Sequence, residues 1–183
     1  MLEEQPLGWV PVEGRGSLPF ALVHGESLVA AASWALGEAG VQLIDAAVAY
    51  DEVRTAGRDL VLHDPLCPLT PADFLAAAAE QCAATGRVVV GYRPVTDTVK
   101  QRIDDHLGET VDRAGLRTVT SPVVIPAAVL AGMEQVGSED FVELVARLAT
   151  LGELSWIEAP AIGARIVAVE DLPSLEALSR SLR

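Results

Sequence analysis

Apolar and polar positions alternate along the chain in blocks that predict strands and helices in turn. Short, nearly continuous apolar runs are typical of buried parallel strands, and longer runs with a helical period predict helices with one apolar face. We expect strands or extended pieces at 8–12, 18–23, 41–50, 59–64, 87–93, 154–160 and 164–169. We expect helices at 25–40, 70–86, 126–135, 138–152 and 171–182. Because the two kinds of element alternate, the pattern predicts an α/β fold with a mostly parallel sheet and helices on both faces.

Local signals predict where two of the helices begin and end. Thr70 is a favourable N-cap residue, Pro71 suits the first helical position, and Gly86 is a typical stop. Ser138 is the expected N-cap of the helix at 138–152. With 183 residues, the chain is expected to form a single domain, 1–183, with a buried core.

One segment interrupts the alternation. Residues 95–122 hold two runs rich in Thr and Val around a polar middle at 104–108, which is the pattern of a long β-hairpin that leaves the sheet. A two-stranded ribbon is only marginally stable alone. We therefore expect this β-arm to pack on a partner and to make the chain a dimer.

Polar residues follow three of the expected strands. His63 and Asp64 end one strand, Asp97 and Lys100 follow the next, and a third polar region follows Val169. Lys100 is the only lysine in the chain. Since ligands of such sheets bind beyond the carboxyl ends of the strands, these positions are the first candidates for a binding site.

Charge and cysteine content narrow the classes of partner. A net charge of −13 argues against nucleic acid and against an anionic membrane surface. A pocket for one small phosphorylated molecule needs only a few local cations and stays open. Cys67 and Cys82 form no CxxC pair, the N-terminus lacks the features of a signal peptide, and no apolar run is long enough to cross a membrane. We therefore expect a cytoplasmic protein.

Several motifs, taken in order, resemble those of the 2-C-methyl-D-erythritol 4-phosphate cytidylyltransferases of isoprenoid precursor synthesis. The stretches "PVTDTVK" and "TVDRAGLRTVTSP" resemble the family's Val-x-Asp-Thr-x-Lys and Thr-Val-Asp-Arg motifs. "LVLHDPLCPLT" is similar to the family's strand that ends in His-Asp, and "ARIVAVEDL" to its Pro-Glu-Asp-Leu ending. The likeness runs from about Asp59 to the C-terminus.

The resemblance implies a three-layer, Rossmann-like nucleotidyltransferase fold with a protruding β-arm at 95–122, and a homodimer formed by exchange of these arms. It implies that Arg113 reaches the sugar phosphate in the partner subunit's pocket. The other residues that it assigns to a sugar-phosphate pocket are Asp97, Lys100, Ser121, Ser138 and Arg165.

The amino-terminal third departs from the family pattern. The family has a glycine-rich loop and nearby cations that hold a nucleotide triphosphate, and this chain has "VPVEGRGSLPF" in its place. Glu13 puts an acid where phosphate would lie, and Phe20 replaces a lysine. The segment that recognises the base in the family is missing between Tyr50 and the strand at 59–64. The candidate remnant of the nucleotide site is Gly14, Arg15, Gly16 and Asp64.

Three functions are therefore open. The chain is a cytidylyltransferase-like protein with weak or no nucleotidyl transfer and a retained sugar-phosphate pocket, an active nucleotidyltransferase with another nucleotide or acceptor, or a non-catalytic partner that pairs through its arm. Magnesium is expected only if nucleotide binding survives, and no other cofactor is expected. No catalytic residue is assigned. The scattered histidines, His24, His63 and His106, predict no metal site built by the protein itself.

The candidate residues also have simpler interpretations. Asp97 and Lys100 fit a solvated pair on a loop, and Arg113 fits a surface ion pair, which contributes little to stability. Asp64 fits a turn after a strand, and Arg15 between two glycines fits ordinary loop chemistry.

Overall fold

The computed structural model describes residues 4–45, 48–136 and 140–180, and its core is a six-stranded sheet in the order β10-β6-β9-β5-β1-β4. The strands are β1 (Leu7–Trp9), β4 (Gln42–Leu43), β5 (Leu60–Leu62), β6 (Val88–Pro94), β9 (Arg117–Ile125) and β10 (Leu154–Glu158). Strand β9 is antiparallel to its neighbours β5 and β6, whereas the other pairs are parallel. Five strands thus point the same way, and the predicted α/β class with a mostly parallel sheet is confirmed.

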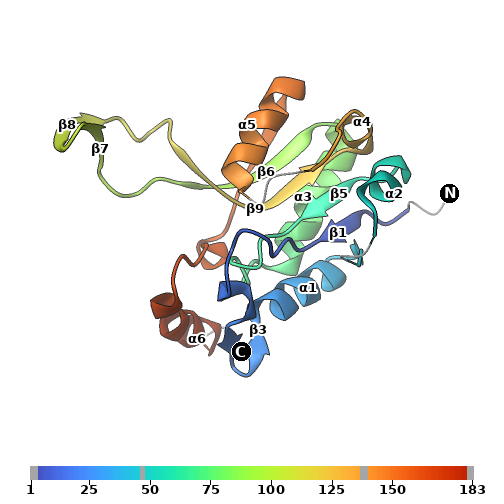
Figure 1. Ribbon diagram of the computed structural model, residues 1–183, viewed down its shortest axis with the longest axis horizontal. Coiled ribbons are helices and arrows are strands. Elements are labelled where there is room, and N and C mark those ends of the chain that lie inside the picture. The colour runs from blue at the N-terminus through green and yellow to red at the C-terminus, as the bar shows by residue number, and fades with distance from the viewer. Residues whose placement is uncertain (1–3, 46–47, 137–139, 181–183) are drawn as a thin grey trace.

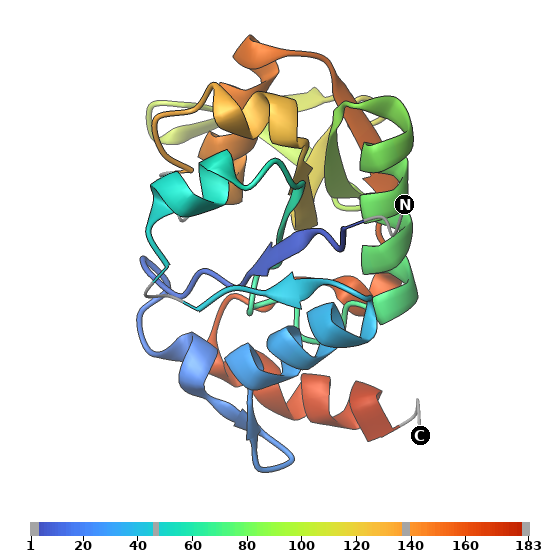
Figure 2. The ribbon, with the colours of Figure 1, turned by 90° about the vertical axis from the view of Figure 1, so that its right-hand side faces the viewer.

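Helices cover both faces of this sheet (Figures 1 and 2). They are α1 (Leu28–Glu38), α2 (Tyr50–Thr55), α3 (Ala72–Thr85), α4 (Ala127–Ala131), α5 (Phe141–Leu151) and α6 (Leu172–Arg180). One apolar cluster joins α1 and α3 to one face of the sheet. A second cluster joins α2, α4 and α5 to the other face. None of the helices in the described part of the chain is both long and apolar enough to cross a membrane.

The two clusters follow from the alternation of side chains along a strand. In β5, Val61 packs in the cluster with α1 and α3, whereas Leu60 and Leu62 pack in the cluster with α2, α4 and α5. Neighbouring strands repeat this pattern, with Val89 of β6 and Val124 of β9 on the side of Val61. Because both faces are buried, these strands are continuously apolar.

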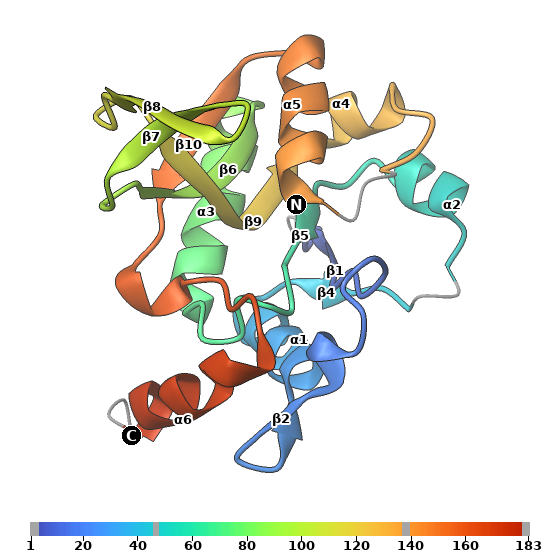
Figure 3. The same cartoon turned by 60° about the vertical axis from the view of Figure 1, so that its left-hand side comes forward.

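The amino- and carboxyl-terminal parts pack together below the sheet (Figures 1 and 3). This layer holds the hairpin of β2 (Leu22–Val23) and β3 (Glu26–Ser27), α6, and the 3-10 helices η1 (Leu18–Phe20), η2 (Ala161–Gly163) and η3 (Val169–Asp171). Leu28, Leu66, Ile166 and Leu175 form its apolar centre. This packing matters for the site because it brings two loops close to the end of β5. They are the loop before η1, which carries Arg15, and the loop before η3, which carries Arg165.

Three expected strands or extended pieces differ from the observed elements, the first of them at 18–23, which forms η1 and only the short strand β2. Among the described residues of the apolar run at 41–50, only Gln42 and Leu43 form a strand, β4, and α2 begins at Tyr50. The strand expected at 164–169 does not form, because the carboxylate of Asp171 accepts the backbone N–H groups of Val167 and Ala168. A side chain that binds nearby N–H groups competes with strand pairing, and the segment becomes a loop followed by η3.

The helix boundaries agree in part with the expected signals. Gly86 ends α3 in the left-handed conformation, with φ 63°, as predicted. Pro71, rather than Thr70, is the N-cap of α3, and the Thr70 hydroxyl donates to the carbonyl of Cys67 instead. Ser138, the expected cap of the next helix, lies outside the described residues, and Asp140 caps α5 by accepting the N–H of Val142 at 2.7 Å.

The predicted β-arm is present as an antiparallel pair of strands, β7 (Val99–Ile103) and β8 (His106–Val111). It projects from the body of the molecule (Figure 1). The expected range 95–122 extends too far, because its last residues, 120–122, are buried within β9 in the central sheet. The arm therefore grows directly out of the neighbouring strands β6 and β9.

Strands β6 and β9 approach each other closely where the ladder shifts register between Val90 and Tyr92. A Cβ atom on Gly91 would lie 2.4 Å from the carbonyl oxygen of Ser121. Only glycine fits this close approach of two backbones. The position thus fixes how the end of β6 meets β9 at the base of the arm.

Candidate functional site

A cleft of about 630 Å³ opens at the edge of the sheet where β5 and β6 end. Because β9 is antiparallel to both strands, its first residues lie at the same edge. The walls come from the loop after β1, the loop after β5, the end of β6 and the residues that follow it, the starts of β9 and α5, and the loop before η3. The cleft has the position that ligands take in open α/β sheets.

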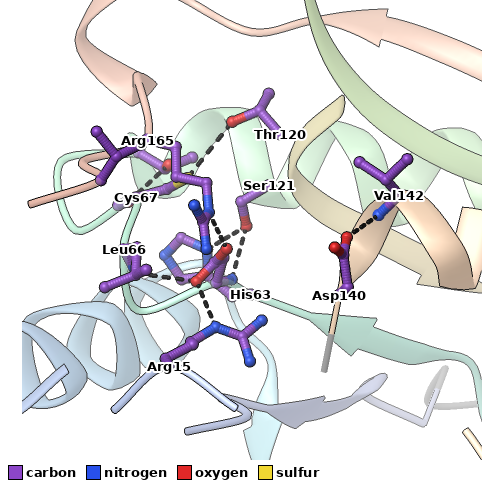
Figure 4. A network of polar contacts seen from close by, with 12 residues as sticks. Arg15, His63, Leu66, Cys67, Thr120, Ser121, Asp140, Val142 and Arg165 are labelled. Carbon is purple, nitrogen blue, oxygen red and sulfur yellow. Dashed lines mark hydrogen bonds and ion pairs between the residues drawn. The ribbon is translucent and has the colours of Figure 1, made fainter. Parts of the chain in front are cut away.

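Asp64 lines this cleft and joins three segments of the chain, those of Arg15, Leu66 and Arg165. Figure 4 shows how the side chains of Arg15 and Arg165 converge there. Its Oδ1 accepts from Nε of Arg15 at 2.9 Å, and its Oδ2 accepts from Nε of Arg165 at 2.8 Å. The N–H of Leu66 also donates to Oδ1, at 3.0 Å. One carboxylate thus holds an arginine from the amino-terminal loop and another from the carboxyl-terminal loop.

The charges around Asp64 keep it ionised. Burial by itself raises the pKa of Asp64, but Arg15, Arg165 and the N–H of Leu66 outweigh burial, so that its pKa lies below the ordinary value. Two guanidinium groups around one carboxylate leave the cluster with a single positive charge. Such a cluster attracts anions, and arginine suits carboxylate and phosphate groups because it presents several donors in one plane.

The loop that carries Arg15 aims its side chain inward. Gly14 and Gly16 have φ values of 72° and 60°, a conformation that glycine adopts without strain. The side chain of Arg15 is only 3% exposed, and its guanidinium lies 5.6 Å from the ring centre of Phe141. Its Nη1 donates to the carbonyl of Glu13 at 3.0 Å. Its Nη2 is buried and has no hydrogen-bond partner among the described residues.

A second layer of polar groups supports Asp64 from below. The hydroxyl of Ser121 accepts the N–H of Asp64 at 3.1 Å and forms a hydrogen bond with Nδ1 of His63. Burial lowers the pKa of His63 to about 4, partly opposed by Asp64, so its imidazole is neutral near pH 7. Ser121 and His63 are fully buried, and they therefore position the end of β5 rather than face a ligand.

Cys67 lies near this layer and is not a reactive thiol. Its Sγ is 3.4 Å from the hydroxyl of Thr120, within the buried interior. Burial and the charge of Asp64 raise the pKa of Cys67 to about 11. Since the thiolate is the nucleophilic form, Cys67 acts here as a small buried side chain.

Comparison with known proteins decides the family. No family model matches the chain. Over 123 residues it is 36% identical to the bifunctional enzyme IspD/IspF of Clavibacter michiganensis, covering 65% of this chain and 30% of that protein. Over 101 residues it is 33% identical to the 2-C-methyl-D-erythritol 4-phosphate cytidylyltransferase of Corynebacterium efficiens, covering 55% of this chain and 36% of that protein.

Solved structures agree with the sequence relatives. A crystal structure of 4-diphosphocytidyl-2C-methyl-D-erythritol synthase superposes with a TM-score of 0.73 at 17% identity, over 98% of this chain and 100% of that one. The 2-C-methyl-D-erythritol 4-phosphate cytidylyltransferase of Thermus thermophilus superposes with a TM-score of 0.68 at 20% identity, over 98% of this chain and 100% of that one. The chain belongs to the methylerythritol phosphate cytidylyltransferase family. The resemblance found in the sequence motifs is thereby confirmed.

The chain spans about a third of the length of these two curated cytidylyltransferase relatives, 30% and 36%. The solved cytidylyltransferase structures, in contrast, are covered over their full length. Their low sequence identity shows a common fold.

The cleft brings together candidate residues that the sequence assigned to two different ligands. Asp97 and Arg165 were expected in a sugar-phosphate pocket, whereas Gly14, Arg15 and Asp64 were expected to be a remnant of a nucleotide site. All five line the same cleft. The pairing of Asp64 with both arginines makes one charged cluster out of the two expected sets.

The other candidates of the cytidylyltransferase pattern lie elsewhere. Lys100 and Arg113 are exposed and lie on or beside the arm, outside the cleft of their own chain. Arg113 donates to the carbonyl of Thr96. Its expected role in a partner subunit stays a prediction. Ser121 is buried beneath the cleft, as described above, and Ser138 lies outside the described residues. Gly16 completes the turn of the Arg15 loop.

Most residues that line the cleft were missed in the sequence, among them Arg93, Thr118, Asp140 and Phe141. Arg93 and Thr118 face each other across β6 and β9, and Asp140 and Phe141 come from the start of α5. Arg93 ends an apolar run, which was a usable signal for a strand end. The other three depend on the antiparallel course of β9 and on the packing of α5, which no local pattern reveals.

Magnesium, which cytidylyltransferases of this family would need for nucleotide transfer, finds no ready site. In the described ranges, no group of three or more His, Cys, Asp or Glu side chains is placed to hold a metal ion. Both oxygens of Asp64 are occupied by arginine. Within the described residues, the contacts of Asp64 therefore fit two guanidinium groups rather than a metal ion.

Proposed function

We propose that this member of the cytidylyltransferase family binds a small phosphorylated polyol in the cleft and transfers a cytidylyl group weakly or not at all. The observation that carries the proposal is the cluster of Asp64 with Arg15 and Arg165, which leaves one positive charge in a protein of net charge −13. A phosphate group balances that charge. Asp97, which lines the same cleft, supplies an acceptor for the hydroxyl groups of a polyol.

The nucleotide side of the cleft lacks the groups that transfer requires. Nucleotidyl transfer needs donors that stabilise charge on the phosphates as the acceptor oxygen attacks phosphorus and pyrophosphate leaves. In the loop after β1, the carboxylate of Glu13 already accepts the N–H of Val12 at 3.2 Å. Phe20, in place of a lysine, is 57% exposed. Losing two or three charge-assisted hydrogen bonds, each worth roughly 1.5–3 kcal/mol, weakens binding by orders of magnitude.

The arm supports a homodimer as part of the same proposal. Ile103 and Leu107 are 59% and 77% exposed on β7 and β8, and a ribbon with exposed apolar side chains is stabilised when a second surface covers it. A second chain is the expected partner. In such a dimer Arg113 would approach the partner's cleft, as the family pattern implies, and add a further cation to it.

Calorimetric titration with 2-C-methyl-D-erythritol 4-phosphate and, separately, with CTP and magnesium tests this proposal. We expect heat from the sugar phosphate and none from micromolar CTP. Release of pyrophosphate when both are present, measured with a coupled assay, is expected to be absent or very slow. Tight CTP binding together with rapid pyrophosphate release would overturn the proposal.

One observation favours a second candidate, an active nucleotidyltransferase with a different nucleotide. The loop of Gly14, Arg15 and Gly16 keeps a left-handed turn at both glycines, and Arg15 lines the cleft. Such a loop can present N–H groups to a phosphate. The same calorimetric titration with ATP, GTP and UTP separates the two candidates, because only the second predicts binding to one of them.

A further inference from the structure

The two arginines of the cleft contact Asp64 in the same unusual way. Each one donates its Nε to a separate carboxylate oxygen, Arg15 at 2.9 Å and Arg165 at 2.8 Å. Arginine more often uses both a terminal nitrogen and Nε in a fork against one carboxylate. Here the Asp64 contacts use neither terminal nitrogen of the two side chains, and Nη1 of Arg15 donates instead to the carbonyl of Glu13. The side chain of Arg165 is 40% exposed, and both arginines line the cleft.

Arg15 has an unsatisfied donor at this place. Its Nη2 is buried, with no hydrogen-bond partner in the described part of the chain, although its side chain is 97% removed from solvent (3% exposed). A buried donor without a partner costs free energy. Native proteins tolerate few such groups, and those that remain call for a specific explanation. A ligand oxygen in the cleft is an explanation for the unpaired Nη2 of Arg15 that also accounts for the position of Arg165.

Asp64 is held too firmly to swing away when a ligand arrives. Its own N–H donates to Ser121, its Oδ1 accepts from Leu66 two residues further along, and Ser121 is in turn bonded to His63. The residue is 3% exposed. The carboxylate is therefore a fixed point on the end of β5, and the guanidinium groups take their orientation from it.

We infer that Asp64 is a positioning residue that holds Arg15 and Arg165 as a two-arginine clamp for a single phosphoryl group. The inference rests on the proposed function for the nature of the ligand, a phosphate monoester, and adds how the site recognises it. The cluster of Asp64, Arg15 and Arg165 has a charge of +1, and a bound phosphate dianion changes it to −1. One phosphoryl group bridges two segments 150 positions apart, residues 15 and 165, and satisfies Nη2 of Arg15.

The decisive test is the sign of the effect of Asp64→Asn on phosphate binding. If Asp64 only competed with the ligand, removal of its charge would tighten binding. If it aims the arginines, the substitution weakens binding, because an amide cannot accept from two guanidinium groups through two charged oxygens. We expect the dissociation constant for inorganic phosphate, measured by calorimetry at constant ionic strength, to rise about tenfold or more.

Variants of the arginines complete the test. Arg15→Lys and Arg165→Lys keep the charge but cannot donate to Asp64 and to phosphate through separate planar nitrogens, and each is expected to raise the dissociation constant about tenfold. Adding Arg165→Lys to Asp64→Asn is expected to cost little more, because the clamp is already lost. Arg87→Gln is the matched control, since Arg87 pairs with Glu153 at the surface, remote from the cleft, and it is expected to bind phosphate as the unchanged protein does.

Each outcome decides a separate point. Tighter binding by Asp64→Asn, or unchanged binding by Arg15→Lys, would overturn the clamp, and so would an unchanged protein that binds no phosphate at millimolar concentration. If Asp64→Asn fails to fold, the two lysine variants still decide. A purely structural role of Asp64 would lower the melting temperature and leave the dissociation constant of the folded variant unchanged, which also contradicts the inference. If the clamp behaves as expected but 2-C-methyl-D-erythritol 4-phosphate binds no better than inorganic phosphate, the proposed ligand fails and the clamp stands.

Discussion

The Nε of Arg165 lies 2.8 Å from Oδ2 of Asp64, across 101 positions of the chain. The opposite oxygen of the same carboxylate holds Arg15, whose side chain is 3% exposed. Removing one member of a buried ion pair leaves the other charge without compensation, which costs about 3–5 kcal/mol. The stability of this cluster is therefore expected to depend on Asp64 far more than on the half-exposed Arg165.

We predict that Asp64→Ala lowers the free energy of unfolding by about 3 kcal/mol or more, because it strands the buried guanidinium of Arg15. Urea unfolding followed by circular dichroism measures the loss. The double variant Asp64→Ala with Arg15→Met is expected to recover part of it, since the stranded charge is gone. A loss of similar size in Arg165→Gln, or no recovery in the double variant, would contradict this explanation.

The parts of this cluster could be found in the sequence, but their contacts could not. Each of Arg15, Asp64 and Arg165 was a candidate for its own reason: a glycine-rich loop, a strand end, and a family motif. The pairing joins residues 49 and 101 positions apart, and it depends on how the terminal layer packs below the sheet. Local patterns carry no information on such a contact.

The fold was predictable to a similar degree. The apolar runs at 59–64 and 87–93 located β5 and β6 because strands buried on both faces are apolar throughout. Strand β9 was hidden at the end of the arm segment, because a central antiparallel strand and the return strand of a hairpin have the same local pattern. The run at 164–169 does not form a strand because the side chain of Asp171 accepts two of its backbone N–H groups. The apolar periodicity of the sequence does not reveal such a contact.

His63 is predicted to make the stability of the protein fall as the pH drops below neutral. Burial lowers its pKa to about 4 in the folded chain, whereas an unfolded histidine titrates near pH 6.5. Between these values the unfolded chain binds the proton and the folded chain does not, so stability is full above pH 6.5 and is lost progressively toward pH 4. The expected loss is roughly 3 kcal/mol.

Thermal unfolding from pH 7 to pH 4 measures this effect in the unchanged protein and in His63→Asn. The variant is expected to be less stable at pH 7, because its contact with Ser121 changes, but to show a flatter dependence on pH. His106→Gln is the control, since His106 is exposed on the arm. Equal slopes in all three proteins would show that His63 does not set the pH dependence.

Gly91→Ala is predicted to be strongly destabilising, because its Cβ would lie 2.4 Å from the carbonyl oxygen of Ser121. Two backbones in adjacent central strands would have to separate, and we expect a loss of about 3 kcal/mol or more from this kind of strain. Gly37→Ala is the matched control: it lies in α1 with no atom within 4 Å of the added Cβ, and it is expected to stabilise by up to about 1 kcal/mol. Chemical unfolding of both variants checks the contrast, and a mild effect of Gly91→Ala would mean that β6 and β9 separate easily at the base of the arm.

The arm is predicted to hold two chains together. Replacing Ile103 and Leu107 by serine removes the exposed apolar side chains of β7 and β8 without disturbing the core, and it is expected to convert a dimer to a monomer at micromolar concentration. Sedimentation velocity measures the change. Leu178→Ser on α6, which is 52% exposed, is the control and is expected to leave the dimer intact. An unchanged protein that sediments as a monomer would remove the basis for the arm as a dimer contact.

The proposed loss of nucleotide binding is predicted to be reversible at two positions. Glu13→Gly frees the N–H of Val12 from the carboxylate that now accepts it, and Phe20→Lys restores a cation at a position that is 57% exposed, so neither change disturbs the core. Each recovered charge-assisted hydrogen bond is worth roughly 1.5–3 kcal/mol, and the double variant is therefore expected to bind CTP and magnesium about a hundredfold more tightly than the unchanged chain. Leu22→Lys, which adds the same charge at a neighbouring residue that is 61% exposed, controls for general attraction of an anion and is expected to gain little. Calorimetric titration of Phe20→Lys, Leu22→Lys and the double variant decides: equal gains in Leu22→Lys and Phe20→Lys would reduce the effect to net charge, and micromolar binding by the unchanged protein would show that the loop after β1 still holds a triphosphate.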